Sequence, residues 1–134
     1  MNAKSGFNKT VLLAGWLILG GSGVSHAELI EIKWADGTFV HNAVVAPRKF
    51  LEVCGKLMKN ENVSWSFKGN APTDFNIHYH VGKDVVYPEN RKETGNAEGT
   101  LRVPVDQDFC WMWSNKAAKA IEIEVRLQQA KPEK

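Results

Sequence analysis

The sequence has 134 residues, and its 17 Lys or Arg and 15 Asp or Glu give a formal net charge of +2 at pH 7. A chain of this length builds one domain. Lys4 and Lys9 lie within residues 1–27, which contain no acidic residue, so the rest of the chain balances 15 basic against 15 acidic residues. This balance gives no electrostatic reason to expect a nucleic acid or an anionic membrane as partner.

The first 27 residues have the pattern of a secretory signal peptide. A basic start with Lys4 and Lys9 precedes an apolar run over residues 11–20, and Ser25-His26-Ala27 supplies the small residues of a cleavage site. The apolar run is short for a membrane span, and no cysteine follows it that would take a lipid anchor. We therefore expect cleavage before Glu28, a periplasmic or secreted protein, and no stable membrane anchor afterwards.

The remainder reads as short strands separated by turns. Thr38 follows the turn signal Asp36-Gly37, and the stretches 68–73 and 89–98 read as loops because they lack an apolar period. Residues 128–134 read as a flexible tail, so the domain is expected over 28–127. The predicted strands are 29–34, 38–45, 50–57, 63–67, 75–81, 85–87, 101–105, 109–113 and 121–127. This pattern predicts an all-β fold, an antiparallel two-sheet β-sandwich.

The segment 109–115, Phe-Cys-Trp-Met-Trp-Ser-Asn, divides by strand parity. Its bulky residues Phe109, Trp111 and Trp113 share the core face, and Trp65 alternates in phase with the core face of its own strand. Cys110 and Met112 point the other way. The segment therefore supplies core residues on one face and sulfur ligands on the other.

Several of these motifs together resemble the GOLD domain, the β-sandwich of secretory-pathway cargo adaptors. The resemblance spans residues 50–127 and rests on an alternating strand with a Gly-Lys-Asp turn and Val-Val-Tyr (74–87), on Glu-Gly-Thr-Leu (98–101), on the segment 109–115 and on a final alternating strand (119–127). It implies a GOLD-like or jelly-roll-like sandwich, a disulfide between Cys54 and Cys110, and a strand end capped by Ser114 and Asn115. The sequence lacks the coiled coil and membrane helix of those adaptors, so the resemblance implies a stand-alone exported domain.

The two cysteines support the same pairing on independent grounds, because a pair of cysteines in an exported chain most often forms one disulfide. Linking Cys54 to Cys110 closes a loop of about 56 residues, which contributes roughly 4 kcal/mol by loop entropy. The alternative is that both thiolates bind a metal ion.

His78 and His80 suggest the sharpest functional hypothesis. Residues two apart in a strand lie about 6.6 Å apart on one face, so both imidazoles can approach one ion. Met112 is the candidate third ligand, because the GOLD resemblance implies that its strand lies beside theirs, and parity places the same face outward. Imidazole and thioether favour copper. Asp74 and Asp84, at the two ends of the histidine strand, are candidate partners that orient an imidazole.

Other interpretations stay open. A His-x-His pair also occurs by chance on a solvent face, where Met112 merely packs, and His41 is expected to be a surface residue. The alternative function is a GOLD-like interaction module that binds an envelope protein without metal; lipid or small-hydrophobe binding requires a cavity between the sheets. No nucleophile elbow, HExxH, P-loop or GxGxxG motif occurs, so a catalytic function is not expected.

Overall fold

The computed structural model describes residues 28–130, which form seven strands. The expected signal peptide lies outside the described residues. Within 28–130 no helix is long and apolar enough to cross a membrane. The strands are β1 (Glu28–Glu31), β2 (Thr38–Val45), β3 (Phe50–Leu57), β4 (Asn62–Val81), β5 (Asp84–Arg102), β6 (Gln107–Ser114) and β7 (Ile121–Gln129).

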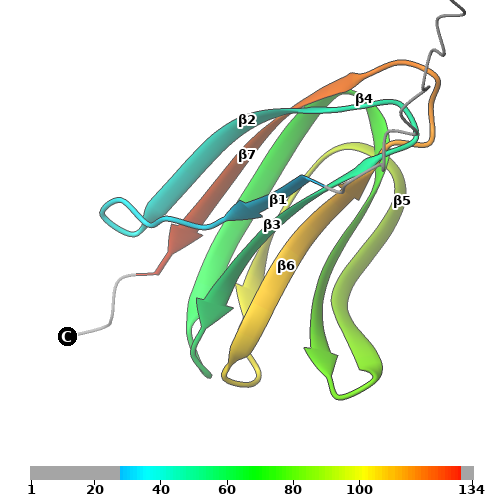
Figure 1. The fold of residues 1–134 in the computed structure, drawn as a ribbon. Coiled ribbons are helices and arrows are strands. Elements are labelled where there is room, and N and C mark those ends of the chain that lie inside the picture. Colours follow the sequence, from blue (N-terminus) through cyan, green and yellow to red (C-terminus); the bar gives the residue numbers. More distant parts are fainter. Residues whose placement is uncertain (1–27, 131–134) are drawn as a thin grey trace, which may run out of the picture.

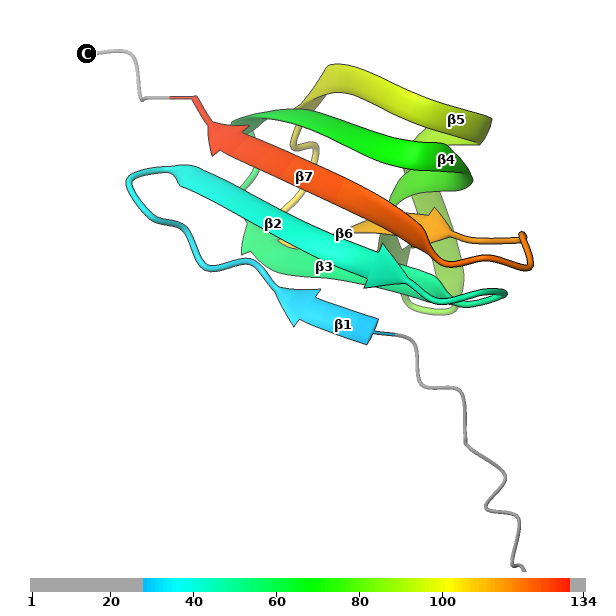
Figure 2. The same ribbon diagram turned by 90° about the horizontal axis from the view of Figure 1, so that it is seen from above.

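The strands form two facing layers, which β4 and β5 join (Figures 1 and 2). The first half of β4 pairs with β7 through residues 63–69, and β7 pairs with β2. The second half pairs with β6 through residues 74–78, and β6 is followed outward by β3 and β1. Because β5 accompanies β4 along both halves, one long hairpin belongs to both layers. This confirms the predicted β-sandwich, with one difference: β1 runs parallel to β3.

The change of layer occurs where the sequence predicted a loop. Pairing between β4 and β5 breaks register between Lys68 and Thr73, yet the strand continues. Gly69 allows the bend, because a Cβ there would lie 3.1 Å from the carbonyl oxygen of Ala71. The Gly, Asn and Pro residues of this stretch therefore mark a bend within a strand, and the predicted loop is wrong.

The predicted loop over residues 89–98 is also wrong, because this stretch is the middle of β5. The sequence pattern indicated a loop because this stretch is rich in charged side chains. Arg91 carries a charge but lies over the indole of Trp65, with 5.5 Å between its guanidinium carbon and the ring centroid, and it bonds to Glu89 at 2.7 Å. A long charged side chain can cover core residues with its aliphatic stem, so polarity alone does not identify a loop.

The core lies between the layers and follows the predicted alternation. Trp65, Trp111 and Trp113 are all buried, which confirms their assignment to the inward face. Phe67, Phe75 and Trp113 pack with ring centroids 4.7 to 5.6 Å apart. The other fully buried large side chains are Phe109, Leu51, Leu57, Ile77, Ile121, Ile123, Leu127, Val45 and Val53.

The Cys54–Cys110 disulfide is present, as predicted. The two residues are directly paired on β3 and β6, and both side chains lie on the outer face of their layer. The bond therefore links neighbouring strands across the sheet surface, outside the core.

The connection after β6 is held by Asn115, which is 2% exposed. Its Nδ2 donates to the carbonyl oxygens of Val45 at 3.0 Å and Lys119 at 2.7 Å, and its Oδ1 accepts from the amide of Ala117 at 2.8 Å. One buried amide thus joins the ends of β2 and β6 to the loop before β7, which is the strand-end role that the resemblance implied.

The final strand is longer than predicted. Gln128 and Gln129 belong to β7, and the amide of Ala130 donates to the carbonyl of Asn62 at 2.9 Å. The domain therefore continues beyond residue 127, where the tail was expected to begin.

Candidate functional site: the outer face around the disulfide

The predicted histidines, Met112 and the two cysteines lie on the outer face of the layer formed by β3, β6 and the second half of β4. Strand register places Cys54, Cys110 and His78 in one row across this face. The neighbouring row contains Glu52, Met112 and Asn76. We call these six residues the disulfide face.

His78 is more enclosed than an ordinary residue of an outer face, with 6% of its surface exposed. Its Nδ1 lies 2.8 Å from Oδ1 of Asn76. Its Nε2 lies 3.5 Å from Oε1 of Glu52, which reaches it from two strands away. Burial lowers the pKa of His78; Glu52 opposes this shift, and His80 adds to it. The ring is therefore enclosed and held by neighbours on two sides.

His80 lies beside His78 but is exposed. The two ring centroids are 5.4 Å apart, and the planes are nearly perpendicular. Tyr87 approaches from β5, with its ring centroid 5.9 Å from that of His78. The predicted pair of imidazoles therefore shares one face, and an exposed tyrosine borders it.

Met112 lies on the same face, one row from His78 and directly between Glu52 and Asn76. It is half-buried. The structure thus places the thioether in the neighbourhood predicted from strand parity, whereas its role as a ligand remains a prediction.

Asp74 and Asp84 do not contact the imidazoles in the role predicted for them. The carboxylate of Asp74 bonds to Lys116, to Nζ of Lys92 at 3.2 Å and to the amide of Glu93 at 3.1 Å. These contacts, chiefly that with Lys116, lower the pKa of Asp74 to about 2. Asp84 is exposed beside the β4–β5 turn, where it pairs with Val81. Asn76 and Glu52 take the places beside His78 instead.

His41 belongs to the opposite layer. It pairs with the buried Val125 of β7 and is half-buried, with its ring centroid 6.1 Å from that of Phe39. It points to the inner side at the rim of the sandwich, so the expectation of a plain surface residue is only partly met, and it is remote from the disulfide face.

A second notable surface lies at the end of the sandwich where three connections meet (Figure 1). The amide of Val103 donates to the carbonyl of Glu61 at 2.8 Å, and Nε2 of Gln107 donates to the carbonyl of His80 at 3.0 Å. These bonds join the β3–β4 turn, the β5–β6 loop and the β4–β5 hairpin. Six of the ten exposed large apolar side chains of the described residues lie on these connections or on the strand ends beside them, and we call them the hairpin end: Met58, Val81, Val85, Val86, Tyr87 and Val105.

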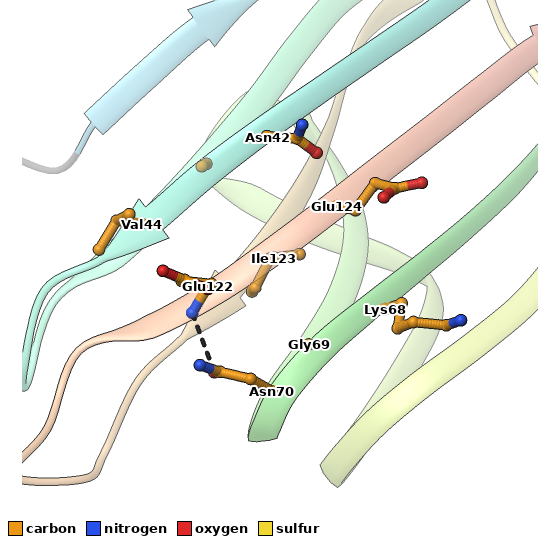
Figure 3. Close-up of a pocket in the computed structure, with 9 residues that line it drawn as sticks. Asn42, Val44, Lys68, Gly69, Asn70, Glu122, Ile123 and Glu124 are labelled. Atoms are coloured by element: carbon orange, nitrogen blue, oxygen red, sulfur yellow. Dashed lines mark hydrogen bonds between the residues drawn. The ribbon is translucent and has the colours of Figure 1, made fainter.

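The other layer has a polar outer surface. A shallow hollow of about 480 Å³ lies over β2, β7 and β4 (Figure 3). Its labelled side chains include Lys68, Glu122 and Glu124, and the amide of Glu122 donates to Oδ1 of Asn70 at 3.0 Å. The hollow lies on the surface and has charged and apolar side chains in its lining, Val44 and Ile123 among the latter. It is not the cavity between the sheets that binding of a lipid or small hydrophobe requires.

Among residues 28–130, the only group of three His, Cys, Asp or Glu residues whose ligand atoms all lie within 4.8 Å of one another is Glu52, Cys54 and Cys110. Its sulfur atoms are bonded to each other, so they offer no thiolate. The disulfide, rather than the alternative thiolate metal site, is the form that the structure shows.

Sequence reasoning missed Glu52, Asn76 and Tyr87. Parity already placed Glu52 with Cys54 and Asn76 with His78 on outer faces. The missing information was the order of the strands. Glu52 can reach His78 because β6 is the single strand between β3 and β4.

No protein-family model and no curated protein matches the sequence. Solved structures do match the fold. Aeromonas hydrophila PliG, a periplasmic lysozyme inhibitor of g-type lysozyme, is 9% identical over 78% of this chain and 97% of its own, with a TM-score of 0.60. PliG of Salmonella Typhimurium is 13% identical over 78% of this chain and 100% of its own, with a TM-score of 0.56.

A third neighbour is the pre-peptidase C-terminal domain of a Bacillus anthracis collagenase, which is 7% identical over 78% of this chain and 96% of its own, with a TM-score of 0.51. At these identities the likeness concerns the fold. It agrees with a β-sandwich, the coarse part of the GOLD resemblance, whereas the GOLD family itself is not among these neighbours. None of the three is described as a copper protein.

Proposed function

We propose that this protein is an exported, non-catalytic module that binds another protein of the cell envelope. The neighbours described as periplasmic lysozyme inhibitors support this class of function, and a g-type lysozyme is the first partner to test. The disulfide and the signal-like start of the sequence support a periplasmic or secreted location.

The hairpin end is the observation that carries the proposal. Val81 is 52% exposed, Tyr87 51% and Met58 49%, although each could have been a polar residue without harm to the core. Apolar residues gathered on one part of a surface mark sites of protein contact more often than scattered ones do. Tyrosine is also enriched at interface centres. The outer surface of the β2–β7–β4 layer is polar apart from Val40 and Val44, so the two regions differ in the partner they suit.

The proposed module is non-catalytic. The enclosed imidazole of His78 contacts an amide and a carboxylate, and no serine or free thiol is paired with it on the disulfide face among the described residues. These contacts offer no side-chain nucleophile for the imidazole to activate.

A matched pair of surface valines tests the binding surface. Val86 lies at the hairpin end and is 38% exposed, whereas Val44 lies on β2 and is 56% exposed. We expect purified protein to slow the lysis of a peptidoglycan suspension by g-type lysozyme, Val86→Asp to weaken this inhibition at least tenfold, and Val44→Asp to leave it unchanged. Circular dichroism confirms that both variants fold.

Absence of inhibition would exclude lysozyme as the partner. The wider proposal is then tested by a photo-crosslinking amino acid placed at position 86 or 44 in the native envelope. A discrete protein adduct from position 86 alone supports it. No adduct from position 86, or equal adducts from both positions, overturns it.

A further inference from the structure

The ring of His78 has two polar neighbours. If Nδ1 carries the proton, it donates to Oδ1 of Asn76 at 2.8 Å, and the lone pair of Nε2 then faces the carboxylate of Glu52 at 3.5 Å. In this tautomer two acceptors face each other, and a cation between them satisfies both.

The separation of these atoms fits a metal ion as the bridging charge. Zinc binds imidazole nitrogen at about 2.0–2.1 Å and carboxylate oxygen at about 2.0–2.2 Å, so tetrahedral ligands lie roughly 3.4 Å apart. The distance from Nε2 of His78 to Oε1 of Glu52 is 3.5 Å. The geometry is that of two ligands already at coordination spacing.

His80 supplies the third group. Two imidazoles bound to one tetrahedral ion have ring centroids about 5 Å apart by the same bond lengths. The centroids of His78 and His80 are 5.4 Å apart. Glu52, His78 and His80 do not meet the 4.8 Å ligand spacing as a set in this structure. The exposed imidazole of His80 must turn toward Glu52, and its exposure leaves it free to do so.

We propose that Glu52, His78 and His80 form a binding site for a divalent transition-metal ion, with zinc as the preferred ion, on the outer face beside the disulfide. Asn76 orients His78 through Nδ1, as a hydrogen-bond acceptor commonly does for a metal-bound histidine.

This site differs from the copper site expected from sequence in one ligand. A carboxylate replaces the thioether, and two imidazoles with a carboxylate are a zinc set that leaves the fourth position open. Met112 lies in the row beside His78 and is not needed as a ligand. Metal binding at this site can be tested without the proposed protein partner, because it requires only the ion.

The test is a titration of purified protein, with its disulfide intact, by zinc in competition with a chromophoric chelator. We expect one zinc ion per chain, and at least a tenfold loss of affinity in Glu52→Gln and in His80→Ala. Two-dimensional NMR of the imidazoles should show zinc-dependent shifts of His78 and His80 and none of His41. Met112→Leu and His41→Ala are the matched controls and should bind zinc as the unmodified protein does.

Both altered side chains, Glu52 and His80, lie outside the core, so the variants should fold, and circular dichroism checks this. Absence of stoichiometric binding, or binding that survives both substitutions, overturns the site. The zinc site would also be overturned if Met112→Leu lost zinc binding and the unmodified protein bound monovalent copper more tightly than zinc. That result would support the ligand set expected from the sequence, His78, His80 and Met112.

Discussion

Gly99 lies against the indole of Trp65, and a Cβ atom there would fall 2.6 Å from Cζ2 of the ring. The two residues are paired across β4 and β5 in the first half of the shared hairpin. The ring is buried, so displacing it to admit a methyl group would disturb the packing of the core. The position therefore admits only glycine because of packing, and no special backbone conformation is involved.

Gly99→Ala should consequently destabilise the protein by about 1–3 kcal/mol, the usual cost of overpacking a core. Chemical denaturation followed by tryptophan fluorescence measures the change. Gly95→Ala, in the same strand, is the control, because a Cβ at that position meets nothing within 4 Å. It should change the free energy of unfolding by no more than about 0.5 kcal/mol. Equal effects at both positions would contradict the packing argument.

Removal of the disulfide in the double variant Cys54→Ala, Cys110→Ala should lower the free energy of unfolding by about 3–4 kcal/mol, because the bond closes a segment with a sequence separation of 56. Guanidinium denaturation gives the value. Reduction of the unmodified protein should reproduce the loss. A loss below about 1 kcal/mol would mean that the unfolded chain is already held compact without the bond.

Asn115→Ala should cost about 2–3 kcal/mol, because it leaves the carbonyls of Val45 and Lys119 and the amide of Ala117 without the partner that Asn115 now supplies. Thermal and chemical unfolding measure it. Asn42→Ala, at an exposed position of β2, is the matched control and should be nearly neutral. A small effect at position 115 would show that water replaces the buried amide.

Asp74 should make the free energy of unfolding decrease as the pH is lowered. Its pKa is lowered from 3.8 to about 2, chiefly by Lys116, so it binds a proton more readily in the unfolded chain. The stabilisation is present above pH 4 and is lost as the pH falls through about 2. Asp74→Asn should therefore reduce stability at pH 6 by on the order of 1 kcal/mol, given screening by solvent, and by progressively less toward pH 2.

Unfolding curves of both proteins between pH 2 and 6 check this prediction. Asp84→Asn, at the exposed hairpin turn, supplies the control at a carboxylate of the same type. A difference between Asp74→Asn and the unmodified protein that stays constant across this range would contradict the role assigned to Lys116.

Local pattern predicted the fold well where strands alternate. The β2, β3, β6 and β7 regions and the inward tryptophans follow from residue parity and spacing. The disulfide follows from the single pair of cysteines in an exported chain and was also implied by the GOLD resemblance. The turn at Asp36-Gly37 is also as predicted, with both residues at positive φ, 50° and 73°. These features depend on neighbours in the chain, which a sequence displays.

The failures share a different cause. The stretches around Gly69 and Arg91 are strands because other strands pair with them: β7 pairs with β4 at Gly69, and β4 pairs with β5 at Arg91. The same is true of the site: His78, His80 and Met112 were correctly assigned to one outer face, but the contact of Glu52 with His78 depends on the order of three strands. Strand order is a property of the whole sandwich and has no local signal.

The hairpin of β4 and β5 belongs to both layers (Figure 1), and this has a consequence for cooperativity. Neither layer can open without separating strands that the other also uses. Backbone amides on β7 and on β6 should therefore exchange with deuterium at one common, global rate, although their strands lie in different layers. The molecule is expected to unfold as a single unit, with no state in which one layer persists alone.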